Sequence, residues 1–152
     1  RVRRIAGAEK QESFVGSDLS YEDIGGRQLA DYTYAFVNEH GTWSGPDGAS
    51  REAWVIESKA RDAGVPYPRS VSTILKDSLV LVHAEQFDRR NERVKVFDVR
   101  RLEKVDGLWT VLALTVANEK AKTRTELDTT SIRYNTGLTE QDFTRRRLEQ
   151  VP

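Results

Sequence analysis

The sequence of 152 residues has no cysteine, no methionine and only two histidines. Without cysteine, a disulfide scaffold, a thiolate zinc site, an iron–sulfur cluster and a cysteine nucleophile are all excluded. His40 and His83 lack the i+4 partner of a helical zinc site, so we interpret them as a polar loop residue and a sheet residue. No run reaches the roughly 18 apolar residues that a membrane-spanning helix needs. We expect no metal, no cofactor, and a body that is peripheral rather than integral to a membrane.

An excess of charge of one sign is also missing. The 24 Lys and Arg balance the 24 Asp and Glu, which removes the long-range field that attracts nucleic acid. Arginines do cluster, but beside acidic residues at turns or element ends, which favours a solvated rim that could still meet anionic headgroups or an acidic partner. The clusters are Arg1/Arg3/Arg4, Arg89/Arg90/Arg93, Arg100/Arg101 and Arg145/Arg146/Arg147. We expect no nucleic-acid partner.

Groups that catalyse reactions are equally scarce. No serine stands in a G-x-S-x-G elbow, and no glycine pair precedes the Lys and Ser or Thr of a phosphate loop. Asp18, Glu22 and Asp23 could act as acid and base, but they fall in a turn whose free helix N–H groups need acceptors. The sequence therefore predicts a protein that is not an enzyme.

What the sequence contains is alternation of period two, typical of strands in a sheet with two different faces. The segment Asp31 to Val37 places Tyr32, Tyr34 and Phe36 on one face, and the turn formers of "NEHGTWSGPDGAS" then predict a long loop. Asp106–Gly107 is a strong hairpin signal. The other predicted strands are residues 52–58, 70–75, 79–87, 94–99 and 108–117, followed by an exposed strand pair or one long strand over 122–134. One mainly β domain over residues 1–152 results: a curved antiparallel sheet or open half-barrel with short helices.

Two short helical pieces are predicted at the flanks of this sheet. Ser20 caps the first with Asp23 three residues on. Thr139 opens a C-terminal helix in the same way, and Leu138 and Phe143 fit a hydrophobic staple. Asn135–Thr136–Gly137 turns the chain before it.

The large apolar residues exceed what a sheet with one solvated face needs, and little helix is predicted to cover them. Either helices beyond this sequence or a second copy cover the apolar face, or the face forms a concave groove for a hydrocarbon chain. Burial of methylene area, at about 25 cal/mol per Å², would supply the affinity of such a groove. The predicted ligand contacts are the large apolar residues at central strand positions, Tyr34, Phe36, Trp54, Ile56, Leu81, Val96 and Leu112.

Several segments resemble the outer-membrane lipoprotein-sorting protein family of the LolA/LolB-like superfamily. They are "RVRRI" (1–5), "SFVGSDLSYEDI" (13–24), "EQFDRRNERVKVF" (85–97) and "TELDTTSIRYNTGLTEQDFTRRRLE" (125–149). The signature falls on Gly16, Ser17, Asp18, Ser20, Tyr21, Glu22 and Asp23. We interpret it as architectural: Ser20 and Asp23 cap the turn, while Tyr21 and Ile24 anchor it to the sheet.

The resemblance implies an open, strongly curved sheet with helices on its concave side, and a chain that is the C-terminal part of a larger half-barrel. It also implies carriage of an acyl lipid or lipoprotein in the periplasm of a Gram-negative bacterium. The alternative is an envelope interaction module that docks an RND-type exporter or another partner, or a second copy of itself, without carrying lipid. Neither hypothesis needs a cofactor.

Overall fold

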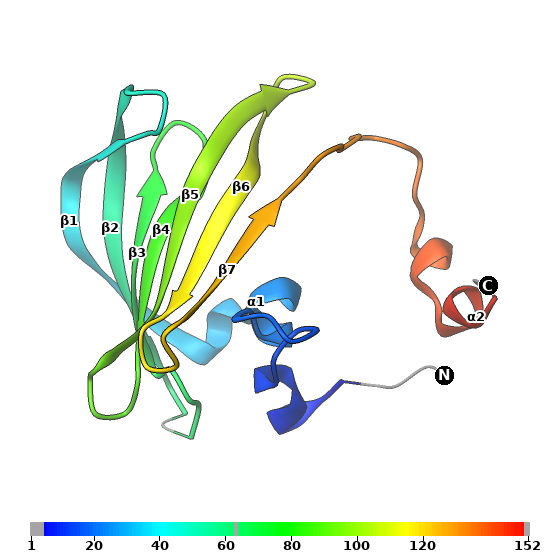
Figure 1. Ribbon diagram of the computed structural model, residues 1–152, viewed down its shortest axis with the longest axis horizontal. Coiled ribbons are helices and arrows are strands. Elements are labelled where there is room, and N and C mark those ends of the chain that lie inside the picture. Colours follow the sequence, from blue (N-terminus) through cyan, green and yellow to red (C-terminus); the bar gives the residue numbers. More distant parts are fainter. Residues whose placement is uncertain (1–4, 63, 151–152) are drawn as a thin grey trace.

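The computed structural model describes residues 5–62 and 64–150, and these form an open sheet of seven antiparallel strands. Each strand pairs with the one before it in the chain, so the spatial order equals the sequence order (Figure 1). The strands are β1 Tyr32–Ser44, β2 Ser50–Ala60, β3 Arg69–Leu75, β4 Leu81–Phe87, β5 Arg93–Val105, β6 Leu108–Asn118 and β7 Thr123–Asp128. The expected fold class is confirmed: mainly β, antiparallel and not closed. The four residues Arg1 to Arg4 of the "RVRRI" segment lie outside the described part.

Turn chemistry sets the register of the hairpins. Asp106 and Gly107 have φ of 51° and 81°, the left-handed pair that a tight β5–β6 turn requires. In the β4–β5 turn, the Asp88 carboxylate accepts hydrogen bonds from the backbone N–H groups of Arg90 and Glu92. The predicted long loop between β1 and β2 is wrong, because β1 continues through two irregularities in register as far as Ser44. Only residues 45–49 remain as the turn between these strands.

Short helical pieces precede the sheet and end the chain. Gly7–Gln11 (η1) and Leu29–Asp31 (η2) are 3-10 turns on either side of α1, Tyr21–Gly25. The single C-terminal helix expected after Thr139 is wrong: the segment divides into η3, Glu140–Phe143, and α2, Arg145–Glu149, because Thr144 is extended and caps α2. Thr139 and Asp142 do form the predicted capping interaction. None of the helices in the described part is long and apolar enough to cross a membrane.

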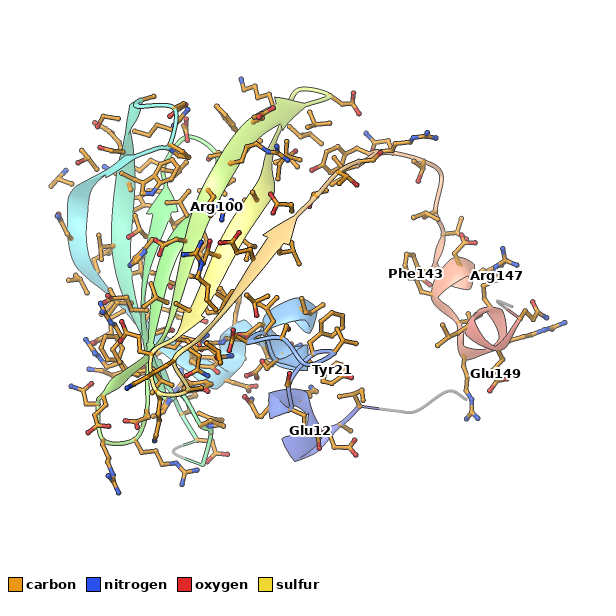
Figure 2. All side chains as sticks on the ribbon, viewed as in Figure 1. Glu12, Tyr21, Arg100, Phe143, Arg147 and Glu149 are labelled. Atoms are coloured by element: carbon orange, nitrogen blue, oxygen red, sulfur yellow. The ribbon has the colours of Figure 1, made fainter. Side chains whose placement is uncertain are left out.

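The C-terminal arm, residues 129–150, begins where β7 ends. The expected strand as far as Tyr134 is wrong beyond Asp128, although the Tyr134 hydroxyl still lies 2.7 Å from the Thr110 hydroxyl. After Tyr134 the arm leaves the sheet, and Phe143 and α2 lie well away from it (Figures 1 and 2). Leu138 and Phe143 are 67% and 77% exposed, so the predicted staple does not bury them.

The main core lies at the end of the sheet that carries the β1–β2, β3–β4 and β5–β6 turns. Ala53, Leu75, Val82 and Leu102 are buried together there. Trp43 and Trp109 pack against this cluster and flank the guanidinium of Arg51, whose carbon lies 5.9 and 5.1 Å from the two ring centroids. Because Ala53 and Leu75 are paired across β2 and β3, one face of the sheet is buried at this end. The opposite face carries the candidate site.

Candidate functional site

A cavity of about 760 Å³ lies on one face of the sheet. Residues of all seven strands line it, together with α1 and the segment that follows α1. Strand pairing aligns Phe36, Ile56, Ser72, Ala84, Phe97 and Val116 in a single row across six strands. Adjacent members of such a row share one face of a sheet, and we call this face the cavity face.

The apolar part of the cavity comes from several rows. Ile74 and Leu81 pair across β3 and β4, and Leu114 and Leu127 pair across β6 and β7. The apolar residues that line the cavity are Leu19, Ile24, Leu29, Tyr32, Tyr34, Ile56, Ile74, Leu81, Ala84, Phe97, Leu114 and Leu127. A lining of this composition and volume is typical of sites that bind apolar small molecules.

Three of the residues predicted from sequence, Tyr34, Ile56 and Leu81, line this cavity. Phe36 and Trp54 are on the same face and extend it, with their ring centroids 6.3 Å apart. Leu112 has the alternation of Leu114 and Val116 and so belongs to this face as well, outside the cavity lining.

Val96 is placed on the other face. It pairs with Glu85 on β4 and Ala117 on β6, in the row that begins at Ala35 and ends at Arg124. Its neighbours Lys95 and Phe97 face the cavity side instead. Alternation in β5 shows that Val96 and Phe97 point to opposite faces but not which of them faces the cavity. The registers of β5 with β4 and β6 decide that Phe97 does.

One end of the cavity face is polar. The row next to Ile56 runs Tyr34, Ser58, Ser70, Gln86 and Lys95. Ser58 and Ser70 are buried, with their hydroxyl oxygens 2.8 Å apart. The cavity therefore has an apolar length and a polar end, and the polar end is the one that α1 covers.

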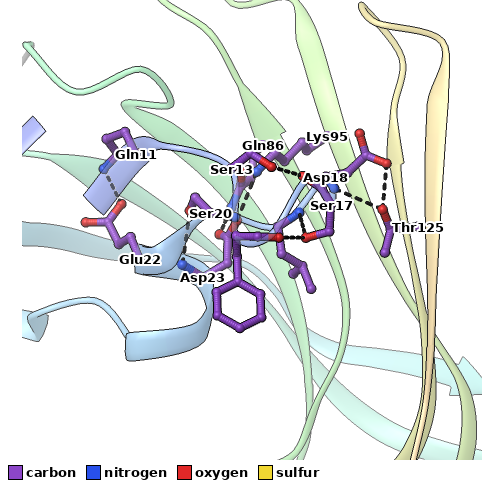
Figure 3. A network of polar contacts seen from close by, with 12 residues as sticks. Gln11, Ser13, Ser17, Asp18, Ser20, Glu22, Asp23, Gln86, Lys95 and Thr125 are labelled. Atoms are coloured by element: carbon purple, nitrogen blue, oxygen red, sulfur yellow. Dashed lines mark hydrogen bonds and ion pairs between the residues drawn. The ribbon is translucent and has the colours of Figure 1, made fainter. Parts of the chain in front are cut away.

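A buried ion pair fixes α1 to this polar end (Figure 3). Lys95 Nζ donates to Asp23 Oδ2 at 2.9 Å, and the two side chains are only 5% and 7% exposed. The same Oδ2 accepts from the backbone N–H and the hydroxyl of Ser20, and Gln86 Nε2 donates to Oδ1. Asp23 thus caps α1, as expected, and also holds it against β4 and β5.

A second carboxylate fixes the loop before α1. Asp18 Oδ2 accepts from the Thr125 hydroxyl, which itself accepts from the Asp18 backbone N–H, both at 2.9 Å (Figure 3). Tyr21, expected to anchor this segment to the sheet, packs edge-on against Phe14 within the segment itself, with centroids 5.5 Å apart. Ile24 lines the cavity. Acidic residues of the signature therefore make the principal polar connections to the sheet.

The pKa of Asp23 reflects this environment. Burial acts to raise the pKa, but the hydrogen bond from the Ser20 backbone N–H and the charge of Lys95 outweigh it, so the pKa lies below its usual value. A carboxyl whose pKa is lower in the folded state stabilises the fold above its unfolded pKa and loses that contribution as pH falls through the folded value.

We therefore expect Asp23→Asn to reduce the loss of stability on acidification. Wild-type protein should lose free energy of unfolding as pH falls below about 4. The variant should be less stable at neutral pH and show a shallower decline in urea titrations across this range. Asp47→Asn is the control: its carboxyl also has a lowered pKa, from the Arg51 hydrogen bond, but it is solvent-exposed. Solvent screens its interactions, so its substitution should change the slope less than Asp23→Asn does. Equal slopes for wild type and Asp23→Asn would contradict the assignment.

Sequence reasoning missed more than half of the cavity lining. Phe97, Leu114 and Ile74 carried the signal of large apolar residues in predicted strands and could have been chosen on that basis. Arg27, Ser58 and Ser70 carried no such signal, because their part in the cavity depends on where α1 crosses the sheet. No cluster of three or more metal-ligating side chains occurs in the part of the chain that the structure describes.

A family model described as "-like: Uncharacterized protein" matches residues 1–150. The chain belongs to this family. No curated protein matches it. A DUF1329 family protein from Desulfovibrio piger is similar, with 32% identity, a TM-score of 0.78, and coverage of 96% of this chain and 59% of that one.

Two further solved structures share the fold. A domain named for outer membrane lipoprotein sorting, from Vibrio parahaemolyticus, has 25% identity and a TM-score of 0.83 over 99% of this chain and 62% of that one. A LolA superfamily protein from Nitrosomonas europaea has 17% identity and a TM-score of 0.63 over 91% of this chain and 60% of that one. The resemblance to LolA-like, lipoprotein-sorting proteins is confirmed. The chain spans about three-fifths of the length of each structure.

Proposed function

We propose that this chain is a non-enzymatic carrier that holds the acyl chain of a lipid or lipoprotein against the cavity face of its sheet, in the periplasm of a Gram-negative bacterium. The cavity carries this proposal. Its volume of about 760 Å³ lies within the roughly 300–1,000 Å³ range of small-molecule sites. Each methylene group moved from water into such a lining contributes about 0.8 kcal/mol, so a long acyl chain is bound without any specific polar contact.

Exposure of the face supports the same proposal. Tyr34, Phe36 and Leu81 are 50%, 56% and 43% exposed on the cavity face, although all three side chains are largely apolar. Exposed apolar side chains gathered on one face in this way are typical of a site where another apolar body binds. A hydrocarbon chain lying along Ile56, Ile74 and Phe97 would cover it.

Trp54 provides a direct test, because it is the tryptophan on the cavity face, whereas Trp43 and Trp109 flank Arg51 beside the core. We expect stearate brominated at the middle of its chain to quench the fluorescence of wild-type protein in a saturable manner. In Trp54→Phe this quenching should fall by more than half, while unbrominated stearate still competes. Quenching that is unchanged in Trp54→Phe would place the lipid elsewhere, and the absence of saturable quenching in wild type would refute the carrier.

A second candidate function rests on the C-terminal arm. Leu138, Phe143 and Leu148 are exposed on a segment that extends away from the sheet (Figure 2). Such an arm could dock an envelope partner, for example an RND-type exporter, or a second copy of the chain. This function predicts that partner capture depends on Phe143 and Leu148, whereas lipid quenching of Trp54 depends on the cavity face.

A further inference from the structure

The polar end of the cavity contains a cation that is not used in an ion pair. Arg27 lines the cavity just after α1 and is half-buried. Its Nη1 donates to the Ser70 hydroxyl at 3.1 Å, and its guanidinium carbon lies 5.3 Å from the Tyr32 ring centroid. Within the described part of the chain, no carboxylate lies within ion-pair distance of Arg27. A guanidinium has five N–H donors, and Ser70 occupies one of them.

The other charged groups of the cavity are already engaged. Asp23 is neutralised by Lys95 at 2.9 Å. Glu22 also lines the cavity, but its Oε2 accepts from Gln11 Nε2 at 2.6 Å, on the side of η1. Because Gln11 is neutral, Glu22 keeps its charge and would oppose an incoming anion, whereas Arg27 would attract it. Arg27 is held in place by a hydroxyl and a ring, which leaves its remaining donors for a ligand.

Neighbouring hydroxyl groups extend this polar end toward the apolar part. Ser72 lines the cavity and shares the row of Ile56 and Ala84, one row further from α1 than Ser70. Trp54 lies four residues from Ser58 along β2, which at about 3.3 Å per residue is roughly 13 Å. A ligand with its polar group at Arg27 would therefore extend its hydrocarbon chain toward Trp54.

Resting on the proposed carrier function, we infer that the ligand is an amphiphile with an anionic head, a carboxylate or a phosphate, which Arg27 binds at the α1 end of the cavity while the acyl chain runs toward Trp54. Guanidinium groups match the geometry of both anions and form strong, charge-assisted hydrogen bonds with them. Such a bond in a partly desolvated site discriminates an anion from a neutral group by roughly tenfold to a hundredfold.

Ligands that share a chain but differ in head group test this inference. Palmitate, hexadecyl phosphate and hexadecanol would each compete with a brominated fatty alcohol for the cavity. The head group of this alcohol is neutral, so its own binding is independent of Arg27. Wild-type protein should bind one or both anions roughly tenfold to a hundredfold more tightly than hexadecanol. Arg27→Gln should bring all three within about twofold, and Arg27→Lys should keep part of the preference. The anion that binds better identifies the source of the head group.

Arg90→Gln is the matched control, because it removes the same charge from the β4–β5 turn, outside the cavity. Its preference should equal that of wild type. Equal binding of the three ligands by wild type, or an unchanged preference in Arg27→Gln, would overturn the inference while the brominated alcohol still binds and the carrier function stands. Failure of the brominated alcohol to bind any variant would overturn both. Thermal unfolding of each variant verifies that it is folded.

Orientation gives a second readout. Stearate brominated near its methyl end should quench Trp54 more strongly than stearate brominated next to the carboxylate. The opposite order would place the head group at the Trp54 end and refute the role of Arg27.

Discussion

Lys95→Met is expected to lower the free energy of unfolding by about 3–5 kcal/mol, the largest effect that we predict for a single substitution. The reason is that Asp23 would keep its charge in a site where both side chains are less than one-tenth exposed. Removing one partner of a buried ion pair leaves the other without compensation for the loss of its hydration. Urea denaturation at neutral pH, with the m-value checked for two-state behaviour, measures the change.

Two controls separate this effect from a general loss of charge. Arg145→Met breaks an ion pair with Glu149 in α2, where the side chains are 80% and 49% exposed. Exposed pairs of this type contribute at most about 1 kcal/mol, so this variant should be nearly as stable as wild type. The double variant Lys95→Met/Asp23→Leu should recover much of the lost stability, because no uncompensated charge remains. A loss below about 1 kcal/mol for Lys95→Met would show that the pair does not hold α1 on the sheet.

The double variant Ile56→Gln/Leu81→Gln is expected to weaken acyl binding by at least about a hundredfold. Both side chains line the cavity, and each fully buried aliphatic side chain contributes about 1.5–3 kcal/mol. Glutamine replaces them with amide groups that lose hydrogen bonds to water when a hydrocarbon covers them. Quenching of Trp54 by brominated stearate measures the affinity in both proteins.

Val71→Gln/Val96→Gln is the matched control for this variant. It also replaces two branched aliphatic residues on strands that are separated by one other strand, but these belong to the row of Glu57 and Glu85 on the opposite face. Its affinity for brominated stearate should remain within about threefold of wild type, even where some stability is lost. Equal losses in the two double variants would indicate that binding depends on the stability of the sheet and not on one face.

The comparison between Lys95 and Val96 shows where sequence reasoning stops. Alternation established that these neighbours point to opposite faces, and it predicted the position of each strand of the sheet, although β1 ends later and β7 ends earlier than expected. The face that each occupies depended on registers with β4 and β6, which pair Lys95 with Gln86 and Asn118. A shift of one residue would exchange the two faces, so a local pattern cannot decide between them.

Strand ends were a second limit. Residues 38–44 contain glycine and polar residues typical of a loop, yet they continue β1 because β2 supplies partners for their backbone groups. In contrast, the residues that follow Asp128 include threonines typical of a strand, yet β7 ends at Asp128. Beyond that point the chain makes only isolated contacts with the sheet, such as that of Tyr134 with Thr110. In both segments the availability of a hydrogen-bonding neighbour outweighed the local preference of the residues.

The absences in the composition already determined much about this protein. The lack of cysteine, of a zinc motif and of net charge excluded several classes of protein. Period-two alternation then predicted a mainly β protein with surplus apolar residues, and Ser20 and Asp23 predicted a capped turn. Only the tertiary structure decided that this turn crosses the sheet at Lys95, that Arg27 enters the cavity beside Ser70, and that Tyr34, Ile56 and Leu81 face it together. These positions result from contacts between segments about 25 to 70 residues apart, and such contacts leave no periodic signal in the sequence.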